Sequence, residues 1–253
     1  MPKTKFSNQS QVRKYNVSNA VASARIEGIT LTKQLEQNLD DYVSGKKSIA
    51  QLVEETKNAM SRYDADDVYC IPDTAVLKNK AGITDQDQLD EYEGDFTAIR
   101  LLELTQNPVE GSFDLTHLCK IHQYLFQDVY EWAGEVRSVD IIRGESRFCN
   151  VRHIQSYSNT VFSAIATEKY LVNLEPKVFS NRLAHYLSEI NAIHPFREGN
   201  GRVQRLFISQ LAEHAGYSLD YSALDQAELY PVMQESFLGN IQPLAGLILK
   251  IID

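Results

Sequence analysis

Residues 194–205 bring groups capable of phosphate chemistry into twelve positions, and they read His-Pro-Phe-Arg-Glu-Gly-Asn-Gly-Arg-Val-Gln-Arg. Pro195 cannot continue a helix and disfavours the helical conformation at His194, so a preceding helix should end there. Gly199 and Gly201 permit positive φ, and a second helix is expected to begin near Gly201. The spacing therefore predicts a tight loop between two helices.

The loop offers groups that can hold a polyphosphate. Main-chain N–H groups of Gly199, Asn200 and Gly201 can turn inward as an anion cradle beside a helix N-terminus with partial positive charge. Arg202 and Arg205 lie three residues apart, hence on one side of the helix, where each can grip phosphate oxygens. This arrangement predicts phosphate binding.

Two further side chains add a metal ligand and a proton acceptor. Glu198 directly precedes the glycine loop, and one carboxylate together with nucleotide phosphates is a usual ligand set for Mg²⁺. His194 stands at the loop entrance, where an imidazole can meet an incoming hydroxyl. The loop therefore predicts a polyphosphate, a metal and a base at one place.

Position for position, the stretch resembles the signature of the Fic family, His-Pro-Phe-x-Asp/Glu-Gly-Asn-Gly-Arg-x-x-Arg. It is not a Walker A loop, because no Gly-Lys-Ser/Thr follows. The resemblance implies transfer of AMP from ATP to a Ser, Thr or Tyr hydroxyl of another protein. It assigns the general base to His194, Mg²⁺ binding to Glu198, the α-phosphate to Asn200, the β-phosphate to Arg202 and the γ-phosphate to Arg205.

A short β-hairpin is expected ahead of this loop, because apolar residues flank a turn at Arg143, Gly144 and Glu145. The block Val129–Arg137 before it also resembles the Fic family. In that family such a hairpin lies over the active site and captures the target backbone as an added strand. The resemblance implies a target-docking flap made of Val139, Asp140, Ile141, Ile142, Arg143, Gly144, Glu145, Ser146, Arg147 and Phe148.

The N-terminal segment is expected to hold three short helices after a polar, poorly ordered stretch at residues 1–15. Ser18 is the expected cap of the first helix, which should end at Ile26. The second helix is predicted at 32–44 and the third at 49–62, where Ser48 and Gln51 form a capping box. Three short amphipathic helices make a small core, so this segment should need a partner surface.

The N-terminal segment contains Ser23-Ala24-Arg25-Ile26-Glu27-Gly28, which covers the end of the first predicted helix and the two residues after it. This run resembles the inhibitory motif of Fic antitoxins, Ser/Thr-x-x-x-Glu-Gly/Asn. The resemblance implies that Glu27 pairs with Arg205 and occupies the charge otherwise offered to the γ-phosphate, with support from Ser23. ATP would then bind with its α-phosphate misplaced, and an error of about 1 Å can cost on the order of 10²-fold in rate.

The chain is therefore predicted to be mainly α-helical, with a Fic-fold helical bundle, a short β-hairpin flap and a small three-helix antitoxin module. Residues 1–63 would form the antitoxin-like module, 64–68 a junction and 69–253 the Fic domain, so that antitoxin and toxin share one polypeptide. Further helices are expected at 85–105, 114–128, 152–167 and 176–193, with the signature helix reaching about 215 and a helical wrap over 221–253.

Composition excludes several other classes of protein. The 253 residues carry a net charge of −9, which argues against nucleic-acid binding. The charge is uneven: residues 1–63 have 10 Lys and Arg against 6 Asp and Glu, whereas the rest has 15 against 28. No apolar run approaches the ~20 residues that cross a bilayer, and no signal peptide is evident. Three widely spaced cysteines suggest neither disulfides nor zinc, in keeping with a cytoplasmic protein.

Other functions remain open at this stage. A Fic enzyme with a different donor or direction, such as UMP transfer or removal of AMP, would use the same phosphate-binding residues. A nucleotide-binding regulatory module without turnover would not need His194. A metallohydrolase built on His194 and Glu198 lacks a third ligand. For the toxin branch that the chain resembles, the family suggests subunits of bacterial type II topoisomerases as targets.

Overall fold

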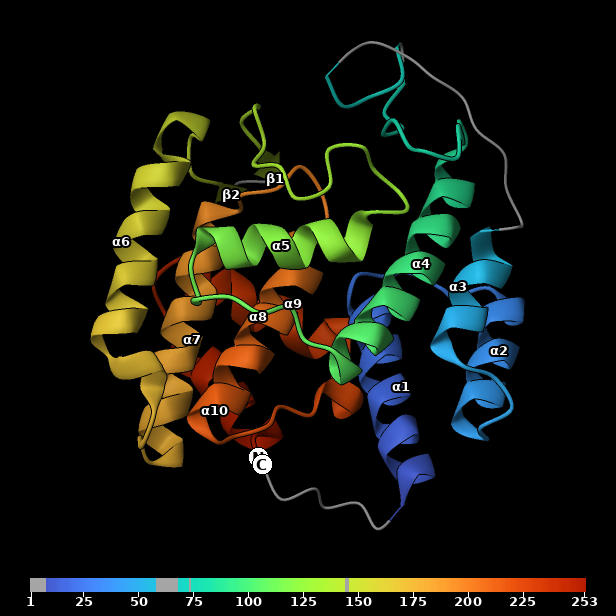
Figure 1. Ribbon diagram of the computed structural model, residues 1–253. Helices are drawn as coiled ribbons and strands as arrows, with labels where there is room; N and C mark the ends of the chain where they lie inside the picture. The colour runs from blue at the N-terminus through green and yellow to red at the C-terminus, as the bar shows by residue number, and fades with distance from the viewer. Residues whose placement is uncertain (1–7, 58–67, 73, 144–145) are drawn as a thin grey trace. The chain divides into compact units, whose positions relative to one another are not determined.

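The computed structural model describes residues 8–57, 68–72, 74–143 and 146–253, which are mainly α-helical as predicted (Figure 1). The chain divides into two compact units. The N-terminal unit contains Thr4–Pro108 and His122–Gly134, and the C-terminal unit contains Val109–Ile121 and Glu135–Asp253. The predicted junction at 64–68 lies mostly outside the described residues, so the predicted domain boundary stays a prediction.

The N-terminal unit contains α1 (Gln9–Ile26), α2 (Lys33–Val43), α3 (Ile49–Lys57) and α4 (Gln86–Gln106). The expectation of a poorly ordered stretch at residues 1–15 was wrong for residues 9–15, because α1 begins at Gln9; residues 1–7 lie outside the described part of the chain. Asn8, not Ser18, caps this helix: its side chain accepts a hydrogen bond of 2.9 Å from the N–H of Gln11. The predicted positions of α2 and the start of α3 are confirmed, and residues 58–62 lie outside the described part of the chain.

The predicted capping box at the start of α3 is present. The N–H of Ser48 donates to Oε1 of Gln51 at 2.8 Å, and the N–H of Gln51 donates to Oγ of Ser48 at 3.3 Å. Each side chain thus satisfies a main-chain donor that the helix itself leaves without an acceptor.

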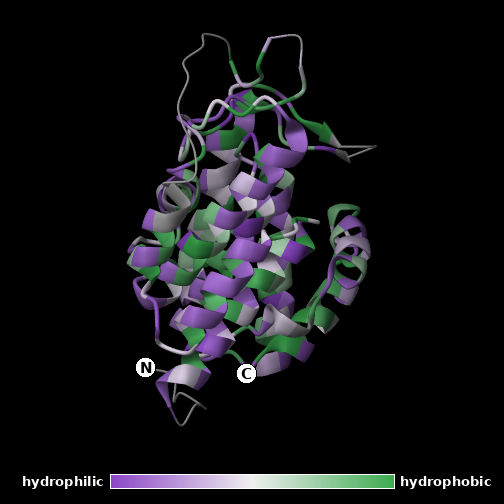
Figure 2. Cartoon of the chain, turned by 90° about the vertical axis from the view of Figure 1, so that its right-hand side faces the viewer, coloured by the Kyte–Doolittle hydropathy of each residue, from purple (hydrophilic) through white to green (hydrophobic). Residues whose placement is uncertain are grey.

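The three short helices share one hydrophobic core with α4, which supplies the partner surface that the small segment needs. The core is built of Ala24 from α1, Leu31, Leu35, Leu39 and Tyr42 from α2 and the residues before it, Ile49, Leu52 and Val53 from α3, and Ala98, Ile99 and Leu102 from α4. In Figure 2 green and purple alternate along individual helices, as expected for amphipathic elements.

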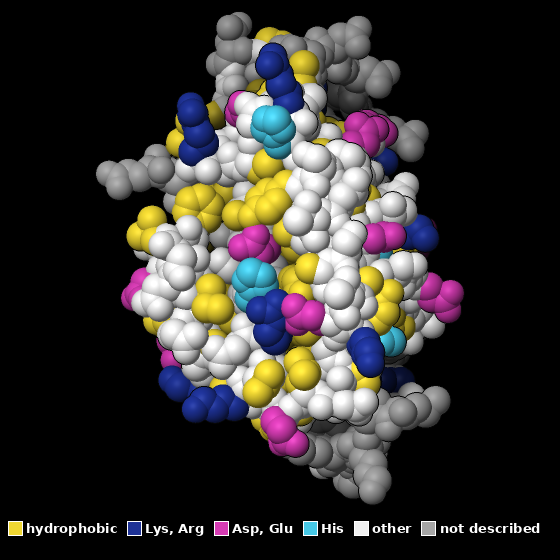
Figure 3. All heavy atoms as spheres, turned by 90° about the vertical axis from the view of Figure 1, so that its left-hand side faces the viewer, with side chains coloured by type: hydrophobic (Ala, Val, Ile, Leu, Met, Phe, Trp, Pro, Cys, Tyr) yellow, Lys and Arg dark blue, Asp and Glu magenta, His cyan; other side chains and the backbone are white. Residues whose placement is uncertain are grey.

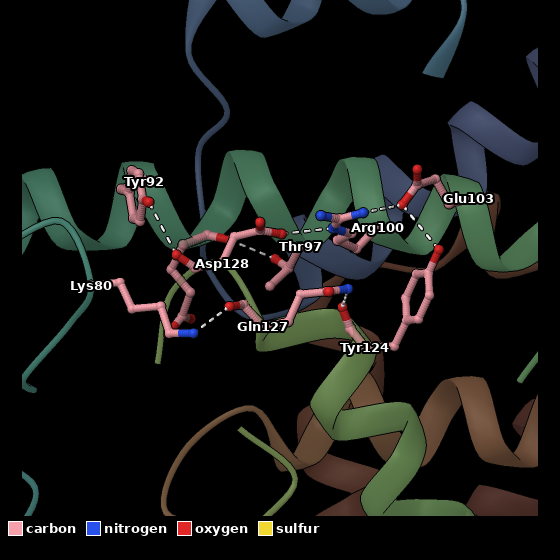
Figure 4. A network of polar contacts seen from close by, with 9 residues as sticks. Lys80, Tyr92, Thr97, Arg100, Glu103, Tyr124, Gln127 and Asp128 are labelled. Atoms are coloured by element: carbon pink, nitrogen blue, oxygen red, sulfur yellow. Dashed lines mark hydrogen bonds and ion pairs between the residues drawn. The ribbon is translucent and has the colours of Figure 1, made fainter. Parts of the chain in front are cut away.

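A polar network lies beside this core within the N-terminal unit (Figure 4). Arg100 of α4 donates to Asp128 at 2.7 Å and to Glu103 at 2.6 Å, and Tyr124 also donates to Glu103 at 3.2 Å. Tyr92 donates to the carbonyl of Asp128 at 3.1 Å. The network joins α4 to the residues that end α5 and precede the predicted flap.

The C-terminal unit is arranged around α7 (Pro176–Ile193), which packs against α6, α8, α9 and α10 (Figure 1). The other helices are α5 (Leu115–Phe126), which crosses the division between the units, α6 (Ile154–Thr167), α8 (Asn200–Ala215), α9 (Gln226–Phe237) and α10 (Gln242–Ile251). Short 3-10 helices span Val151–His153, Lys169–Leu171 and Tyr221–Ala223. All helices predicted after residue 85 are thus present, with ends shifted by one or two residues.

The predicted hairpin is formed by β1 (Ile142–Arg143) and β2 (Ser146–Arg147), which pair antiparallel with Ile142 opposite Arg147. Gly144 and Glu145 lie outside the described residues. None of the described helices is both long and apolar enough to cross a bilayer. Acidic and basic side chains are interspersed on the face shown in Figure 3, with no continuous basic stripe there.

Candidate active site

His194 occupies a special backbone position at the end of α7. It has φ 48° and ψ 61°, a left-handed conformation, and its N–H donates to the carbonyl of Ile190 at 3.0 Å. The prediction that Pro195 ends the helix at this point is therefore confirmed. The imidazole is carried at the entrance of the following loop, and His194 is 6% exposed.

The loop after His194 is closed by the side chain of Asn200. Its Oδ1 accepts from the N–H of Phe196 at 2.9 Å, and its Nδ2 donates to the carbonyl of Phe196 at 2.8 Å. Phe196 itself is 1% exposed and anchors the loop in the core. Since the side-chain amide of Asn200 is used inside the loop, its main-chain N–H is the group that could face a phosphate.

Only one of the two predicted glycines uses positive φ. Gly199 has φ 78° and precedes the first residue of α8, whereas Gly201 lies within the helix and is not among the residues of positive φ. The helix therefore begins at Asn200, one residue earlier than expected. Its N-terminus, with partial positive charge, opens directly onto the loop.

Glu198 and the two arginines frame this helix N-terminus. Oε1 of Glu198 accepts from the N–H of Gly199 at 2.8 Å and lies 3.9 Å from a terminal nitrogen of Arg202. Arg202 is 1% exposed and Arg205 is 6% exposed, so both predicted phosphate ligands are buried cations. Burial of this kind strengthens their interaction with an anion, because solvent screens them weakly.

Tyr221 lies close to Arg205. Its hydroxyl is 3.5 Å from the carbonyl of Arg205, to which Ser209 also donates at 2.9 Å. Burial raises the pKa of Tyr221 to about 12, although Ser209 and the positive charge of Arg205 act in the opposite direction. Tyr221 therefore remains a neutral hydroxyl beside the arginine at physiological pH.

The donor set suits a Mg²⁺ ion that arrives with a nucleotide. Mg²⁺ is commonly held by one or two carboxylates plus substrate phosphates and water. Glu198 supplies such a carboxylate, and its side chain is 26% exposed at the loop surface. Among the described residues no group of three or more His, Cys, Asp or Glu could hold a metal without a nucleotide.

The predicted flap is anchored at its base rather than free along its whole length. Ile142 and Val139 are 57% and 37% exposed, as expected of residues that could meet a target. Phe148, by contrast, is 9% exposed, and its ring stacks on the imidazole of His194. Asp140 accepts from the N–H of Val151 at 2.9 Å and from Asn150 at 2.6 Å, which closes the hairpin base.

No role was predicted for Arg137 from the sequence, but in the structure this residue connects the hairpin to α7. Its guanidinium donates to the carbonyls of His194 at 2.8 Å, Val139 at 2.6 Å and Cys149. The only signal in the sequence is that Arg137 is the last residue of the block Val129–Arg137 that resembles the family. Nothing in that spacing distinguishes a buried arginine from an exposed one.

The predicted inhibitory residues lie in the N-terminal unit. Ser23 is 7% exposed within α1, and Glu27 follows the last residue of that helix, with its N–H donating to the carbonyl of Ala24 at 3.1 Å. Glu27 is half-buried. Arg205 belongs to the C-terminal unit, and its pairing with Glu27 remains a prediction.

Comparison with known proteins identifies the family. The profile of the Fic/DOC family matches residues 112–212, which include the hairpin and the whole 194–205 loop. A probable protein adenylyltransferase of Sinorhizobium fredii, y4lH, is 42% identical over 195 residues that cover 76% of this chain and 100% of that protein. The chain belongs to the Fic/DOC family. The resemblance drawn from the loop signature is thus confirmed.

A second profile and two further proteins extend this assignment. The profile of the antitoxin VbhA matches residues 13–59, which confirms the antitoxin-like segment at the start of this Fic chain. The protein adenylyltransferase VbhT of Bartonella schoenbuchensis is 43% identical over 190 residues, 75% of this chain; the match covers 40% of VbhT, less than half of that relative. The crystal structure of the BepC protein of Bartonella tribocorum, with bound AMPPNP, superimposes with a TM-score of 0.69 at 26% identity, covering 73% of this chain and 96% of that one.

Proposed function

We propose that this Fic protein is a protein adenylyltransferase that its own N-terminal segment holds inactive. It would transfer AMP from ATP to a hydroxyl of a target protein and release pyrophosphate. One observation carries the proposal: the 194–205 loop presents a histidine, a helix N-terminus and two buried arginines together, in a chain that spans the whole of a relative named as a probable protein adenylyltransferase.

Each residue of the loop has a distinct task in this proposal. His194 takes the proton from the target hydroxyl, a contribution that is typically 10²–10⁴-fold in rate. The N–H groups of Gly199, Asn200 and Gly201 receive the α-phosphate, while Arg202 and Arg205 hold the β- and γ-phosphates. Glu198 would hold Mg²⁺, which supplies charge neutralisation on the phosphates when bound. The chain thus acts mainly by positioning and by electrostatic stabilisation.

Inhibition would come from Glu27 in the antitoxin-like segment. A carboxylate paired with Arg205 removes the positive charge that the γ-phosphate needs, and ATP then binds with its α-phosphate away from the line of attack. Ser23 lies one turn earlier in α1 and supports the placement of Glu27. Antitoxin and toxin functions would therefore reside in one polypeptide.

The target class follows from the family resemblance alone. We propose subunits of bacterial type II topoisomerases, modified in the cytoplasm, where ATP and these targets occur together. The exposed hairpin residues Val139, Asp140 and Ile142, together with the half-buried Ile141, would register the target main chain, as an added strand does at a sheet edge.

Labelling with ATP that carries its label on the α-phosphate tests the proposal. Glu27→Gly should label a purified topoisomerase subunit or itself, whereas the unchanged protein should not. Glu27→Gly combined with His194→Ala should bind ATP but transfer nothing. Ser44→Gly, at the exposed C-terminal cap of α2 in the same segment, is the matched control and should remain inactive.

Competition between α-labelled ATP and α-labelled UTP separates the donors. If Glu27→Gly transfers the label of UTP in preference to that of ATP, the adenylyl assignment is wrong. If neither nucleotide is transferred although both bind, the chain is a nucleotide-binding regulator and the proposed activity fails.

A further inference from the structure

Phe148 and the imidazole of His194 form a close parallel pair in the C-terminal unit. Their ring centroids are 3.7 Å apart and their planes differ by 14°. Phe148 also makes an edge-to-face contact with Phe237, with the ring centroids 5.6 Å apart and the planes at 78°. Phe148, which directly follows β2, therefore sets the plane of the His194 imidazole, the proposed base.

Arg137 holds the main chain of His194 in place. Its side chain is 0% exposed, and its guanidinium donates to the carbonyl of His194 at 2.8 Å. The N–H of Arg137 donates to the carbonyl of Pro195 at 2.8 Å. A cation that donates hydrogen bonds to the carbonyls at the end of α7 also complements the negative end of the helix.

The guanidinium of Arg137 also binds the residues on either side of the hairpin. It donates to the carbonyl of Val139 before β1 at 2.6 Å and to the carbonyl of Cys149 after β2. The N–H of Cys149 in turn donates to the carbonyl of Ala192 in α7 at 2.9 Å. Arg137 thus connects the residues next to β1 and β2 with the C-terminal end of α7.

We propose that Phe148 and Arg137 are positioning residues for His194: Arg137 holds His194 in its left-handed backbone conformation, and Phe148 fixes the plane of the imidazole. A left-handed conformation costs free energy for any residue with a Cβ, so external hydrogen bonds are needed to maintain it. The proposal rests on the proposed role of His194 as the base. It also separates Phe148 from the exposed hairpin residues that would contact the target.

As a consequence, Arg137 would position both the hairpin that docks the target and the histidine that takes the proton. Arg137 and Asp140 would fix the position of the hairpin and therefore of a target strand that pairs with it. Phe148, which follows β2, would hold the imidazole of His194 in place for that target. Because a displacement of about 1 Å can cost on the order of 10²-fold in rate, loosening either residue should reduce turnover without weakening nucleotide binding.

Kinetics of variants made in the Glu27→Gly protein test the proposal. Phe148→Leu and Arg137→Gln should each lower kcat about 10²-fold, while Kd for ATP changes less than about twofold. Phe148→Tyr keeps a flat ring and should retain most of the activity. Phe162→Leu is the control for a lost buried ring, because Phe162 is 5% exposed and its ring contacts Phe207.

A second measurement does not depend on turnover. In the full-length protein with Glu27 in place, the carbon-bound imidazole protons of His194 should show a ring-current shift by NMR, and Phe148→Leu should remove it. Phe148→Tyr should preserve it, and Phe162→Leu should leave it unchanged.

The outcomes are separable from those of the proposed function. Absence of labelling by the Glu27→Gly parent refutes the proposed function, and the imidazole shift then decides whether Phe148 holds the ring. Given an active parent, unchanged kcat in Phe148→Leu and Arg137→Gln overturns the inference. A loss in Phe162→Leu equal to that in Phe148→Leu also overturns it, because the effect would then reflect general loss of packing.

Discussion

Asp95 of α4 accepts two hydrogen bonds from Thr32, the residue that caps the N-terminus of α2. Oδ1 receives the N–H of Thr32 at 3.1 Å and Oδ2 receives its hydroxyl at 2.6 Å. Asp95 is 8% exposed, and burial raises the pKa of its carboxyl while the two hydrogen bonds act in the opposite direction. A buried carboxylate without such donors is costly, so this contact fixes the antitoxin-like segment to α4.

Thr32→Ala should therefore weaken the N-terminal unit. The substitution removes the hydroxyl donor to Asp95 and also the cap that accepts the N–H of Leu35 at 3.1 Å. We expect a loss of about 1–3 kcal/mol in the free energy of unfolding, measured by urea titration. Thr32→Ser retains the hydroxyl and should lose less than half as much. Equal stability of Thr32→Ala and the parent would show that the contact is not stabilising.

Gly94 of α4 provides a second test of how closely the antitoxin-like segment packs against this helix. A Cβ at this position would lie 2.2 Å from Cγ2 of Ile29, so the side chain of Ile29 would have to move. In an open helix Gly→Ala stabilises by roughly 0.5–1 kcal/mol. Overpacking costs typically 1–3 kcal/mol, which should outweigh that gain. Gly94→Ala is thus expected to lower the midpoint of thermal unfolding.

Gly246→Ala in α10 is the matched control for Gly94→Ala. Nothing lies within 4 Å of a Cβ placed at Gly246, so the helix-propensity gain should appear there without a steric cost. In the Ile29→Ala background, which lacks the clashing methyl, Gly94→Ala should no longer lower the stability, although Ile29→Ala alone loses packing against the core. If Gly94→Ala raised stability as much as Gly246→Ala, the close packing of α4 and Ile29 would be refuted.

Local rules predicted most of the helices because their start and stop signals lie in the sequence. Gly28 and Gly45 follow α1 and α2 with φ of 77° and 82°, as helix-ending glycines do. The start of α1 was missed because two acceptable capping residues, Asn8 and Ser18, precede apolar positions. Without tertiary contacts, nothing in the sequence favoured the earlier one.

The sequence predicted which residue types the loop brings together, but not their internal bonding. The loop signature singled out His194, Glu198 and the two arginines, and the structure places them in one loop and the helix that follows it; their roles stay predictions. It did not show that the amide of Asn200 closes the loop or that Gly201 is helical, because both depend on where α8 begins. The support that Arg137 gives to His194 could not be predicted, since its acceptors are main-chain carbonyls, two of which, in Cys149 and His194, lie 12 and 57 residues along the chain and have no sequence signature.

Arg100 and Asp128 should behave as a buried ion pair in the N-terminal unit. Their side chains are 10% and 8% exposed, and Nε of Arg100 donates to Asp128 at 2.7 Å. Removing one partner leaves a buried charge uncompensated, which typically costs 3–5 kcal/mol. We expect Asp128→Leu to show a smaller loss than this in urea unfolding, because Glu103, 2.6 Å from Arg100, still pairs with the guanidinium.

The double variant Arg100→Met/Asp128→Leu is the informative companion to this experiment. Since a buried pair can be replaced by apolar residues with little net cost, the double variant should be more stable than Asp128→Leu alone. A double-variant loss equal to the sum of the two single losses would mean that the charges do not interact. The polar network of Figure 4 would then contribute no coupling between α4 and the end of α5.

Glu168 and Arg182 should make the stability of the C-terminal unit depend on pH in the acid range. Nε of Arg182 donates to Oε2 of Glu168 at 2.7 Å, and a terminal nitrogen of Arg182 donates to Oε1. These hydrogen bonds hold the pKa of Glu168 below its ordinary value of 4.5, although burial acts in the opposite direction. The folded protein thus favours the carboxylate more strongly than the unfolded chain does.

The sign of the effect follows from that lowered pKa. The stabilisation is complete above about pH 4.5 and is lost as pH falls through the pKa of folded Glu168, because the proton then binds in both states. Both side chains are about one third exposed, so solvent screening limits the expected gain to about 0.5–1 kcal/mol. Glu168→Gln should cost this amount at pH 7 and progressively less as the pH is lowered from 4.5 in urea titrations. Arg182→Gln should show the same trend, and a cost of Glu168→Gln that stayed constant down to pH 2 would contradict the proposed linkage.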